Sequence, residues 1–390
     1  PDADLRAVTG LDHLYLRLPW STLEPHRGEI RWELVDDLVR RWSPHGVGIG
    51  LGVTLKETNG DAAVPDWVGA KGRWVESGWS RDFEPEWDDP KMLVAYESLQ
   101  RRLATRYAGK PWLRYVDLRS YGDWGEGHTS FGSKTVASAA VLERHARLLR
   151  RAWPTTLLYA VDDIVTQGVP ASESTRFADT LRKLGMSFRD DSLLVRWYVD
   201  GHPTTGSVRS VDLFESVWRL RPTLLETQHY SMSADRTKDD TWRGRDGSER
   251  GGATLERAVD VSHATWVGYH GWAGDWMRDN PGLHARLLNR MGYHLRPASM
   301  RRDGKSIRIE WRNEGVAPPY RRYPLRLRVG GREVVVSSDS RRWMPGSVTE
   351  TYPCPFAGPI SVRLGAKRPV ELALREELRE SDGWYRLPDR

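Results

Sequence analysis

Residues 113–128, "LRYVDLRSYGDWGEGH", decide the fold. The first part has the apolar pattern of a buried strand, and the second part is a glycine-rich turn that carries Glu126 between Gly125 and Gly127. A carboxylate among small residues, directly after a buried strand, is more typical of a site than of a surface. The stretch therefore predicts a buried strand with a candidate site at its end, and the α/β fold follows from the segments on both sides of it.

Strand-like apolar runs alternate with helix-period segments on both sides of this stretch, which predicts parallel β/α units. Seven strands are predicted, in residues 11–20, 47–55, 113–120, 155–161, 188–194, 222–230 and 264–273. The segments predicted as helices are residues 31–46, 91–109, 134–153, 172–186, 211–220, 254–263 and 281–293. Residues 56–90 are predicted to be a long loop.

Seven such units are one fewer than a (β/α)8 TIM barrel contains. We therefore predict a barrel over residues 1–295 whose first strand lies upstream of the numbered chain or is replaced by residues 1–10. Beyond residue 296 the sequence changes to short alternating runs separated by Gly and Pro, such as "SIRIEWRNEG". This pattern predicts a C-terminal antiparallel β-sandwich domain over residues 296–390.

Composition excludes several classes of protein. The chain of 390 residues contains no apolar run near the roughly 18 residues that a membrane span requires. Its net charge of +6 comes from arginines spread along the chain, without the compact basic tract that would indicate nucleic-acid binding. Cys354 is the only cysteine, so the chain has no internal disulfide and no CxxC metal site.

Nineteen Trp against six Phe is an unusual balance, and flat indole faces suit either a large core or a platform for sugar rings. The chain begins with Pro1 and shows no charged-then-apolar leader. We therefore expect that a targeting segment was removed or that the fragment starts late. An extracellular or cell-surface location is favoured over the cytoplasm, and the oligomeric state cannot be predicted from the sequence.

Two carboxylates occupy the strand ends that would converge at the mouth of a barrel. Glu126 follows the strand in 113–120, and Glu226 lies in "PTLLETQHY", at the end of another strand. Glycoside hydrolysis needs two carboxyl groups, one to protonate the leaving oxygen and one to attack the anomeric carbon or activate water. Glu126 and Glu226 are therefore the candidate catalytic pair, although each could instead form a salt bridge at the rim.

The sequence also resembles a known family, the bacterial domain of unknown function numbered 4832, which is similar to the retaining glycoside hydrolases of clan A. The resemblance lies in "LYLRLPWSTLEPHRGEIRWELVDDLV", "VPDWV", "YVDLRSYGDWGEGH", "FRDDSL", "PTLLETQHY" and "IRIEWRNEGVAPPYRRYPLRLRV". It implies that Glu126 is the acid/base, that Glu226 is the nucleophile and that no cofactor is needed. One departure is that clan A usually has Asn before the acid/base, where this chain has Gly125.

Other residues near the strand ends are candidates for contacts with a carbohydrate, and each has a structural alternative. Arg17 either orients a carboxylate or belongs to a structural ion pair, and His128 is either a sugar ligand or a loop residue. Asp190 and Asp191 either bind hydroxyls or cap a helix or pair with Arg. The remaining candidates are Trp20, Trp124, His229, Tyr230, His270 and Trp272.

Among these, Tyr230 is placed to donate a hydrogen bond to the nucleophile, and Trp272 is expected to form the floor of the sugar site or to pack in the core. Trp67 either lines a distal subsite or is buried beneath its loop. Metal binding is not predicted, because the histidines lack HExxH or HxH spacing. The leading hypothesis is a retaining glycosidase, and the alternatives are an inverting hydrolase and a carbohydrate-binding protein without turnover.

Overall fold

The computed structural model describes residues 5–78, 80–234, 250–366 and 369–387. The chain forms two compact units, Pro1–Ser192 and Leu193–Arg390. This division falls inside the segment that the sequence assigns to a single barrel, so the domain boundary at residue 295 stays a prediction.

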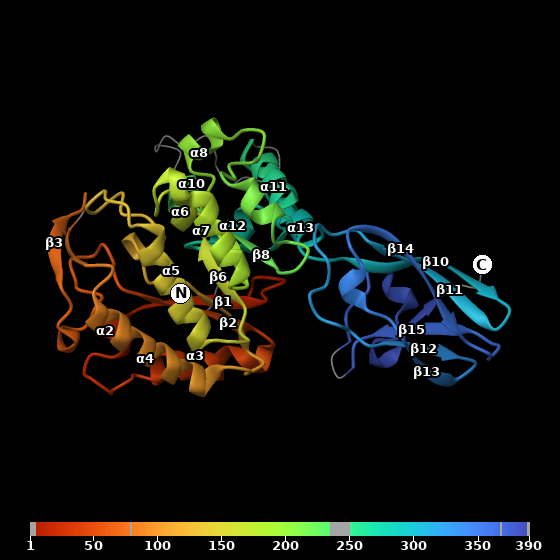
Figure 1. The fold of residues 1–390 in the computed structure, drawn as a ribbon. Coiled ribbons are helices and arrows are strands. Elements are labelled where there is room, and N and C mark those ends of the chain that lie inside the picture. Colours follow the sequence, from red (N-terminus) through yellow and green to blue (C-terminus); the bar gives the residue numbers. More distant parts are fainter. Residues whose placement is uncertain (1–4, 79, 235–249, 367–368, 388–390) are drawn as a thin grey trace. The chain divides into compact units, whose positions relative to one another are not determined.

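Parallel strands form the first part of the fold, as Figure 1 shows in red to green. In the described residues the parallel sheet has seven strands, in the sequential order β1-β2-β5-β6-β7-β8-β9. They are β1 (His13–Pro19), β2 (Gly48–Thr54), β5 (Leu113–Asp117), β6 (Leu158–Val161), β7 (Met186–Leu193), β8 (Thr223–Thr227) and β9 (Ala264–Gly268). Each overlaps a predicted strand, so the predicted series of seven is confirmed, and the order fits a TIM-like fold.

Residues 5–10 form no strand, and residues 1–4 lie outside the described part of the chain. The expectation that residues 1–10 replace the first barrel strand is therefore not met in residues 5–10. These residues contain turns instead, with the Val8 amide donating to the Leu5 carbonyl at 3.2 Å.

The helices follow the predicted alternation. Those predicted from sequence are α3 (Glu33–Trp42), α4 (Pro90–Tyr107), α5 (Ala139–Ala152), α7 (Ala171–Lys183), α9 (Val211–Glu215), α11 (Arg250–Ser262) and α13 (Pro281–Leu288). The helices that the sequence did not predict are α2 (Trp20–Leu23), α6 (Asp163–Thr166), α8 (Arg196–Gly201), α10 (Tyr230–Ala234) and α12 (Ala273–Asp279). Within the first unit α4 packs beside α5, and α5 beside α7. Helix α4 begins where Pro90 fixes the first turn and the Asp89 carboxylate accepts from the Lys91 amide at 2.9 Å.

Strand β2 (Gly48–Thr54) is buried at every residue, as expected of a strand covered on both faces. Gly50 and Gly52 point to the same face, because side-chain positions alternate along a strand. A Cβ at Gly50 would lie 2.3 Å from the Tyr115 ring, and one at Gly52 would lie 2.5 Å from the Tyr15 hydroxyl. The glycines therefore leave room for large polar side chains from the neighbouring strands.

The segment predicted as a long loop, residues 56–90, contains a hairpin of β3 (Gly72–Glu76) and β4 (Arg81–Pro85). The prediction of an irregular loop is therefore wrong for these two stretches. The Trp74 ring packs edge-on against Phe83 at 5.9 Å, a cross-strand pair that stabilises a hairpin. The strands were missed because most of β3 is exposed and lacks the apolar alternation of a half-buried strand.

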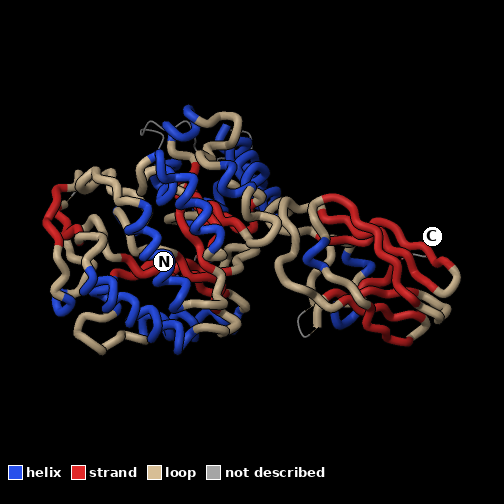
Figure 2. The backbone as a smooth tube through the Cα atoms, in the orientation of Figure 1, coloured by secondary structure: helices blue, strands red, loops and turns tan. Residues whose placement is uncertain are grey.

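The remaining strands are antiparallel, shown in red toward the C-terminal end in Figure 2. One sheet has the order β10-β11-β14 and the other β13-β12-β15-β16. Their bounds are β10 (Leu295–Asp303), β11 (Ser306–Asn313), β12 (Leu325–Val329), β13 (Arg332–Val336), β14 (Gly346–Pro353), β15 (Ile360–Leu364) and β16 (Tyr385–Leu387). Buried residues of both sheets belong to one hydrophobic core, where Trp311 and Trp343 stack at 4.5 Å. Cys354 is buried in the same core.

Candidate active site

The turn after β5 has a backbone that only glycine-rich sequence can adopt. Gly122, Gly125 and Gly127 have φ values of 88°, 69° and 82°, and Trp124 between them has a φ of 51°. The Gly127 amide donates to the Tyr121 carbonyl at 3.0 Å, which closes the turn. This tight turn fixes the position from which Glu126 extends.

The position before Glu126 is sterically restricted to glycine in this backbone. A Cβ at this position would lie 2.4 Å from the backbone carbonyl oxygen of Arg119, closer than side chains approach backbone. The positive φ adds a conformational penalty for any other residue. An asparagine side chain therefore does not fit before Glu126 in this backbone.

Glu126 lies between two arginines at the end of the strand. Its Oε1 is 3.4 Å from Nη1 of Arg17 and 3.4 Å from Nη1 of Arg119, and its side chain is 15% exposed. Burial and, after it, the charge of Asp191 together raise the pKa of Glu126 to about 8, against the opposing effect of Arg119 and Arg17. At neutral pH this carboxyl therefore holds a proton while keeping access to solvent.

A buried polar network lies behind Glu126. Nε of Arg119 donates to the Tyr15 hydroxyl at 2.7 Å and to Oδ2 of Asp117 at 2.9 Å, and the Tyr15 hydroxyl donates to the same carboxylate oxygen at 3.0 Å. Nε of Arg189 lies 3.3 Å from that oxygen. Both arginines are about 1% exposed, so the network holds the Arg119 guanidinium in one position beside Glu126.

Arg17 connects Glu126 to a second carboxylate that the sequence did not single out. Nη2 of Arg17 lies 3.5 Å from Oε2 of Glu57, and the Thr54 hydroxyl donates to Oε1 of Glu57 at 2.6 Å. Arg17 is 33% exposed at its side chain and so borders solvent. These ion pairs fit both alternatives for Arg17, the orientation of a carboxylate and a structural ion pair, so its role stays a prediction. The position of Glu57 just after β2 was the available signal.

Asp190 and Asp191 are both buried at the end of β7. Oδ2 of Asp191 lies 3.5 Å from Nη2 of Arg189, so Asp191 is paired with an arginine, and its contact with sugar hydroxyls stays a prediction. Asp191 also acts on Glu126 through its charge, as the raised pKa of Glu126 shows. Asp191 is therefore an electrostatic neighbour of the candidate acid.

His128 and Trp124 belong to the same turn as Glu126. His128 is 8% exposed, and its Nδ1 lies 3.7 Å from Oδ2 of Asp123. Burial acts to lower the pKa of His128, but Asp123 and other nearby carboxylates raise it above its ordinary value. The Trp124 ring is half-buried and meets Phe131 edge-on at 5.1 Å. Asp123 itself accepts from the fully buried Lys56 ammonium at 2.5 Å.

Glu226, the predicted nucleophile, and some of the candidate sugar contacts lie in the second unit. Glu226 lies near the end of β8 opposite Gly268 of β9, and it is partly exposed. His229 meets His270 edge-on at 5.1 Å and Trp272 edge-on at 5.6 Å. A Cβ at Gly271 would lie 2.6 Å from the His229 ring, so glycine is needed for this contact. The structure thus brings His229, His270 and Trp272 together, with Trp272 55% exposed.

Two predicted contacts take other roles. Trp20 is completely buried, and its Nε1 donates to Oε2 of Glu24 at 3.0 Å. The prediction that Trp20 contacts substrate is wrong, because helix α2 begins at this residue and the ring packs against Trp67 and Tyr96. The Tyr230 hydroxyl donates to Asp279 at 2.5 Å, so its proton is directed there and not to Glu226.

Within the described residues, no three His, Cys, Asp or Glu side chains are grouped as ligands for a metal ion. The helices of the same residues include none with the length and apolar character needed to cross a membrane.

No family model and no curated protein matches the chain, so the resemblance to the domain of unknown function 4832 stays a prediction. Among solved structures, the chain is similar to the endo-glycoceramidase II of Rhodococcus sp., with a TM-score of 0.45 and 13% identity over 90% of this chain and 91% of that one. It is similar to the β-galactosidase of Rahnella sp. R3, with a TM-score of 0.48 and 14% identity over 78% of this chain and 55% of that one.

A third similar structure is the glycoside hydrolase family 10 xylanase of Thermobacillus composti, with a TM-score of 0.40 and 12% identity over 70% of this chain and 88% of that one. The chain spans little more than half of the Rahnella enzyme. Likenesses of this strength do not assign an activity or a substrate to this chain.

Proposed function

We propose that this protein is a retaining glycoside hydrolase that cleaves a glycosidic bond in an oligo- or polysaccharide. The observation that carries the proposal is Glu126. It follows a parallel strand, is held by a glycine turn, keeps 15% of its side chain exposed, and has a pKa raised to about 8. A carboxyl that stays protonated at neutral pH and reaches solvent is suited to act as a general acid.

In the proposed mechanism, Glu126 donates its proton to the leaving glycosidic oxygen while the carboxylate of Glu226 attacks the anomeric carbon. The C–O bond to the leaving group breaks, and an ester forms between the sugar and Glu226. Glu126, now a carboxylate next to Arg17 and Arg119, then takes a proton from water, which attacks the ester and releases the sugar with retained configuration. The proton returns to Glu126 in each cycle.

The electrostatic surroundings of Glu126 suit both steps. Burial and the charge of Asp191 favour the protonated form before the first step. Arg17 and Arg119 limit the free-energy penalty of the carboxylate that exists between the steps. The acid is thus weak enough to hold its proton and still able to release it.

The scaffold in this proposal is a (β/α)8 barrel up to residue 295 followed by a β-sandwich. Side chains at the strand ends, Trp124, His128, Asp190, Asp191, His229, His270 and Trp272, are proposed to contact the sugar. Trp272 would stack its exposed ring on the apolar face of a pyranose.

A second candidate function is carbohydrate binding without turnover. Gly125 favours it, because the backbone leaves no space there for the asparagine that clan A usually uses to bind a sugar hydroxyl. In that case Glu126 and Glu226 would bind hydroxyl groups without exchanging protons or forming an ester.

A substrate screen with matched variants separates the two functions. The wild-type protein, Glu126→Gln and Glu226→Gln would be assayed against aryl glycosides and against plant and bacterial polysaccharides. A glycosidase requires a substrate on which the wild type is active and Glu226→Gln is slower by at least about 10³-fold. Binding of the same sugar by all three proteins, with turnover by none, would favour the second function.

A further inference from the structure

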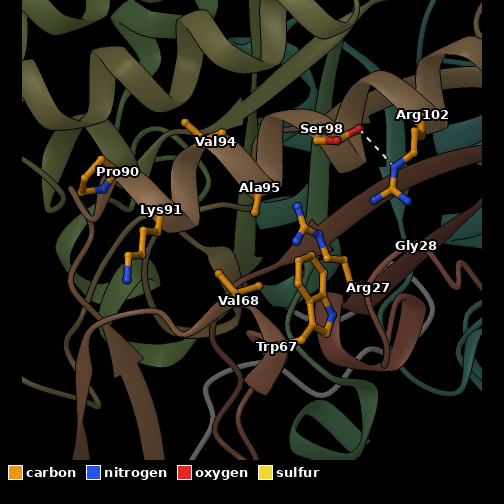
Figure 3. A pocket seen from close by; sticks show the side chains of 10 residues that line it. All are labelled: Arg27, Gly28, Trp67, Val68, Pro90, Lys91, Val94, Ala95, Ser98 and Arg102. Carbon is orange, nitrogen blue, oxygen red and sulfur yellow. Dashed lines mark hydrogen bonds between the residues drawn. The ribbon is translucent and has the colours of Figure 1, made fainter.

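A pocket of about 740 Å³ lies between helix α4 (Pro90–Tyr107) and the segments that carry Arg27 and Trp67. This volume is in the range that holds small-molecule ligands. Figure 3 shows its two sides, with Lys91, Val94 and Ala95 on helix α4 and with Trp67 and Arg27 extending toward the helix from the facing loops. None of these residues belongs to the candidate active site.

The wall that carries Trp67 is built around a buried carboxylate. Glu24 is fully buried and accepts from the Gly28 amide at 2.9 Å, from Nη2 of Arg102 at 2.5 Å and from Nε1 of Trp20 at 3.0 Å. Nε1 of Trp67 donates to the Glu24 backbone carbonyl at 3.0 Å. These bonds fix the Trp67 ring before any ligand arrives, which reduces the ordering penalty of binding.

The charged side chains that line the pocket are all cations. Its lining includes the cations Arg27, Lys91 and Arg102 and contains no Asp or Glu side chain. Arg102 is neutralised by Glu24. Arg27 and Lys91 are exposed, and in the part of the chain that the structure describes neither forms an ion pair. Two uncompensated cations facing one pocket favour an anionic ligand.

Apart from Ser98, the remaining lining is mostly apolar. The Trp67 indole is half-buried, and Val68, Val94 and Ala95 lie around it. An indole face packs well on the C–H face of a pyranose ring, and guanidinium and ammonium groups bind carboxylate or sulfate through charge-assisted hydrogen bonds. The pocket therefore has the two kinds of surface that an acidic sugar requires.

We propose that this pocket is a binding site for an anionic saccharide, with a pyranose ring on Trp67 and its carboxylate or sulfate between Arg27 and Lys91. The choice of a saccharide rests on the proposed carbohydrate function, whereas the choice of an anion rests on the pocket itself. The site would hold an acidic glycan apart from the candidate active-site residues.

Titration calorimetry with three saccharides tests the proposal. The probes are trigalacturonate, a sulfated galactan trisaccharide and neutral galactotriose, each added to the full chain at low salt. We expect at least one acidic probe to bind at least 10-fold more tightly than the neutral one, with affinity falling as salt is added. The acidic probe that binds identifies carboxylate or sulfate as the recognised group. Equal binding of all three, or binding of none, would overturn the proposal.

Variants locate the binding. Trp67→Ala and the double variant Arg27→Ala/Lys91→Ala should each lower the affinity for the acidic probe at least 10-fold. Lys110 is an exposed cation outside the pocket, so Lys110→Ala should leave this affinity unchanged. Trp67→Phe keeps an aromatic face and should retain more affinity than Trp67→Ala. It tests the role of the ring if the Ala variant does not fold. Unchanged affinity in the double variant would contradict the site.

Glu126→Gln should bind the probe as the wild type does, because Glu126 does not line the pocket. Binding by an inactive chain would therefore support the pocket while the glycosidase proposal fails. Hydrolysis of a neutral sugar by a chain that binds neither acidic probe would support the glycosidase proposal and overturn the pocket proposal.

Discussion

Nη1 of Arg119 lies 3.4 Å from Oε1 of Glu126, and yet the pKa of this carboxyl is raised to about 8. The desolvation of Glu126 and the negative charge of Asp191 outweigh the attraction of the guanidinium groups. Arg119 is also engaged by Asp117 and Tyr15, so part of its charge is already compensated. The pKa of Glu126 is thus the balance of groups whose removal should move it in opposite directions.

We expect Asp191→Asn to lower the pKa of Glu126 and Arg17→Gln to raise it, because the first change removes a negative charge and the second a positive one. With a substrate in hand, the alkaline limb of kcat/KM should move to lower pH in Asp191→Asn and to higher pH in Arg17→Gln. Carboxyl carbon NMR titration measures the same shifts without a substrate. Asp212→Asn, an exposed site, is the control and should leave the titration unchanged. Shifts of the same sign in both variants would refute this account of the pKa.

Glu126→Gln should be more stable than the wild type at alkaline pH. The unfolded chain releases the Glu126 proton near pH 4.3, whereas the folded chain holds it up to about pH 8. The wild type therefore has its full stability below pH 4.3 and loses this contribution as the pH rises to 8. In urea unfolding at pH 8, we expect the free energy of unfolding of Glu126→Gln to exceed that of the wild type by at least about 1 kcal/mol. At about pH 4.3 the two values should be equal. Glu76→Gln, at an 80% exposed side chain, should show no such pH dependence.

Gly125→Asn should destabilise the protein without adding activity. The new side chain meets the Arg119 carbonyl at a Cβ distance of 2.4 Å and also adopts a φ of 69°. Gly109→Asn is the matched control, because Gly109 has a φ of 73° and open space around the position of a Cβ. The control should lose about 1 kcal/mol of unfolding free energy, and Gly125→Asn should lose at least about 2 kcal/mol more. Equal losses in the two variants would show that the turn can open.

Trp272→Ala should raise KM more than it lowers kcat on a confirmed substrate, because a stacking ring binds the ground state and the transition state alike. Trp272 is 55% exposed and contacts His229 only through its edge, so its removal should leave the fold intact. Steady-state kinetics give both constants, and Trp197→Ala, at a 68% exposed ring, serves as the control. Identical KM values in the wild type and Trp272→Ala would exclude the ring from the sugar site.

The sequence was sufficient to predict the parallel strands, because each is an apolar run between turn signals, and strands such as β2 are buried throughout. It was also sufficient to place Glu126 at a strand end, where glycines with positive φ mark the turn. These features depend on local sequence. The hairpin of β3 and β4 was missed because its first strand is mostly exposed and gives no apolar pattern.

The sequence singled out Arg17 but could not show which carboxylates it meets, because the partners of the candidate acid come from distant parts of the chain. Arg17 and Glu126 are 109 residues apart, and Glu57 joins them from another strand end. Trp20 shows the same limit at a single residue. Its place directly after β1 suggested a substrate contact, but the turn into helix α2 sends the ring into the core.

The most direct test of the central claim is to trap the proposed glycosyl-enzyme ester and locate it by mass spectrometry. Once a substrate is known, the matching 2-deoxy-2-fluoro glycoside with a good leaving group should label the wild-type chain on Glu226. The fluorine slows both formation and hydrolysis of the ester, and the good leaving group keeps formation the faster of the two. Glu226→Gln should take up no label, and Glu126→Gln should take up label only from a reagent with a good leaving group. A label on another residue, or full turnover by Glu226→Gln, would contradict the assignment of Glu226 as nucleophile and Glu126 as acid/base.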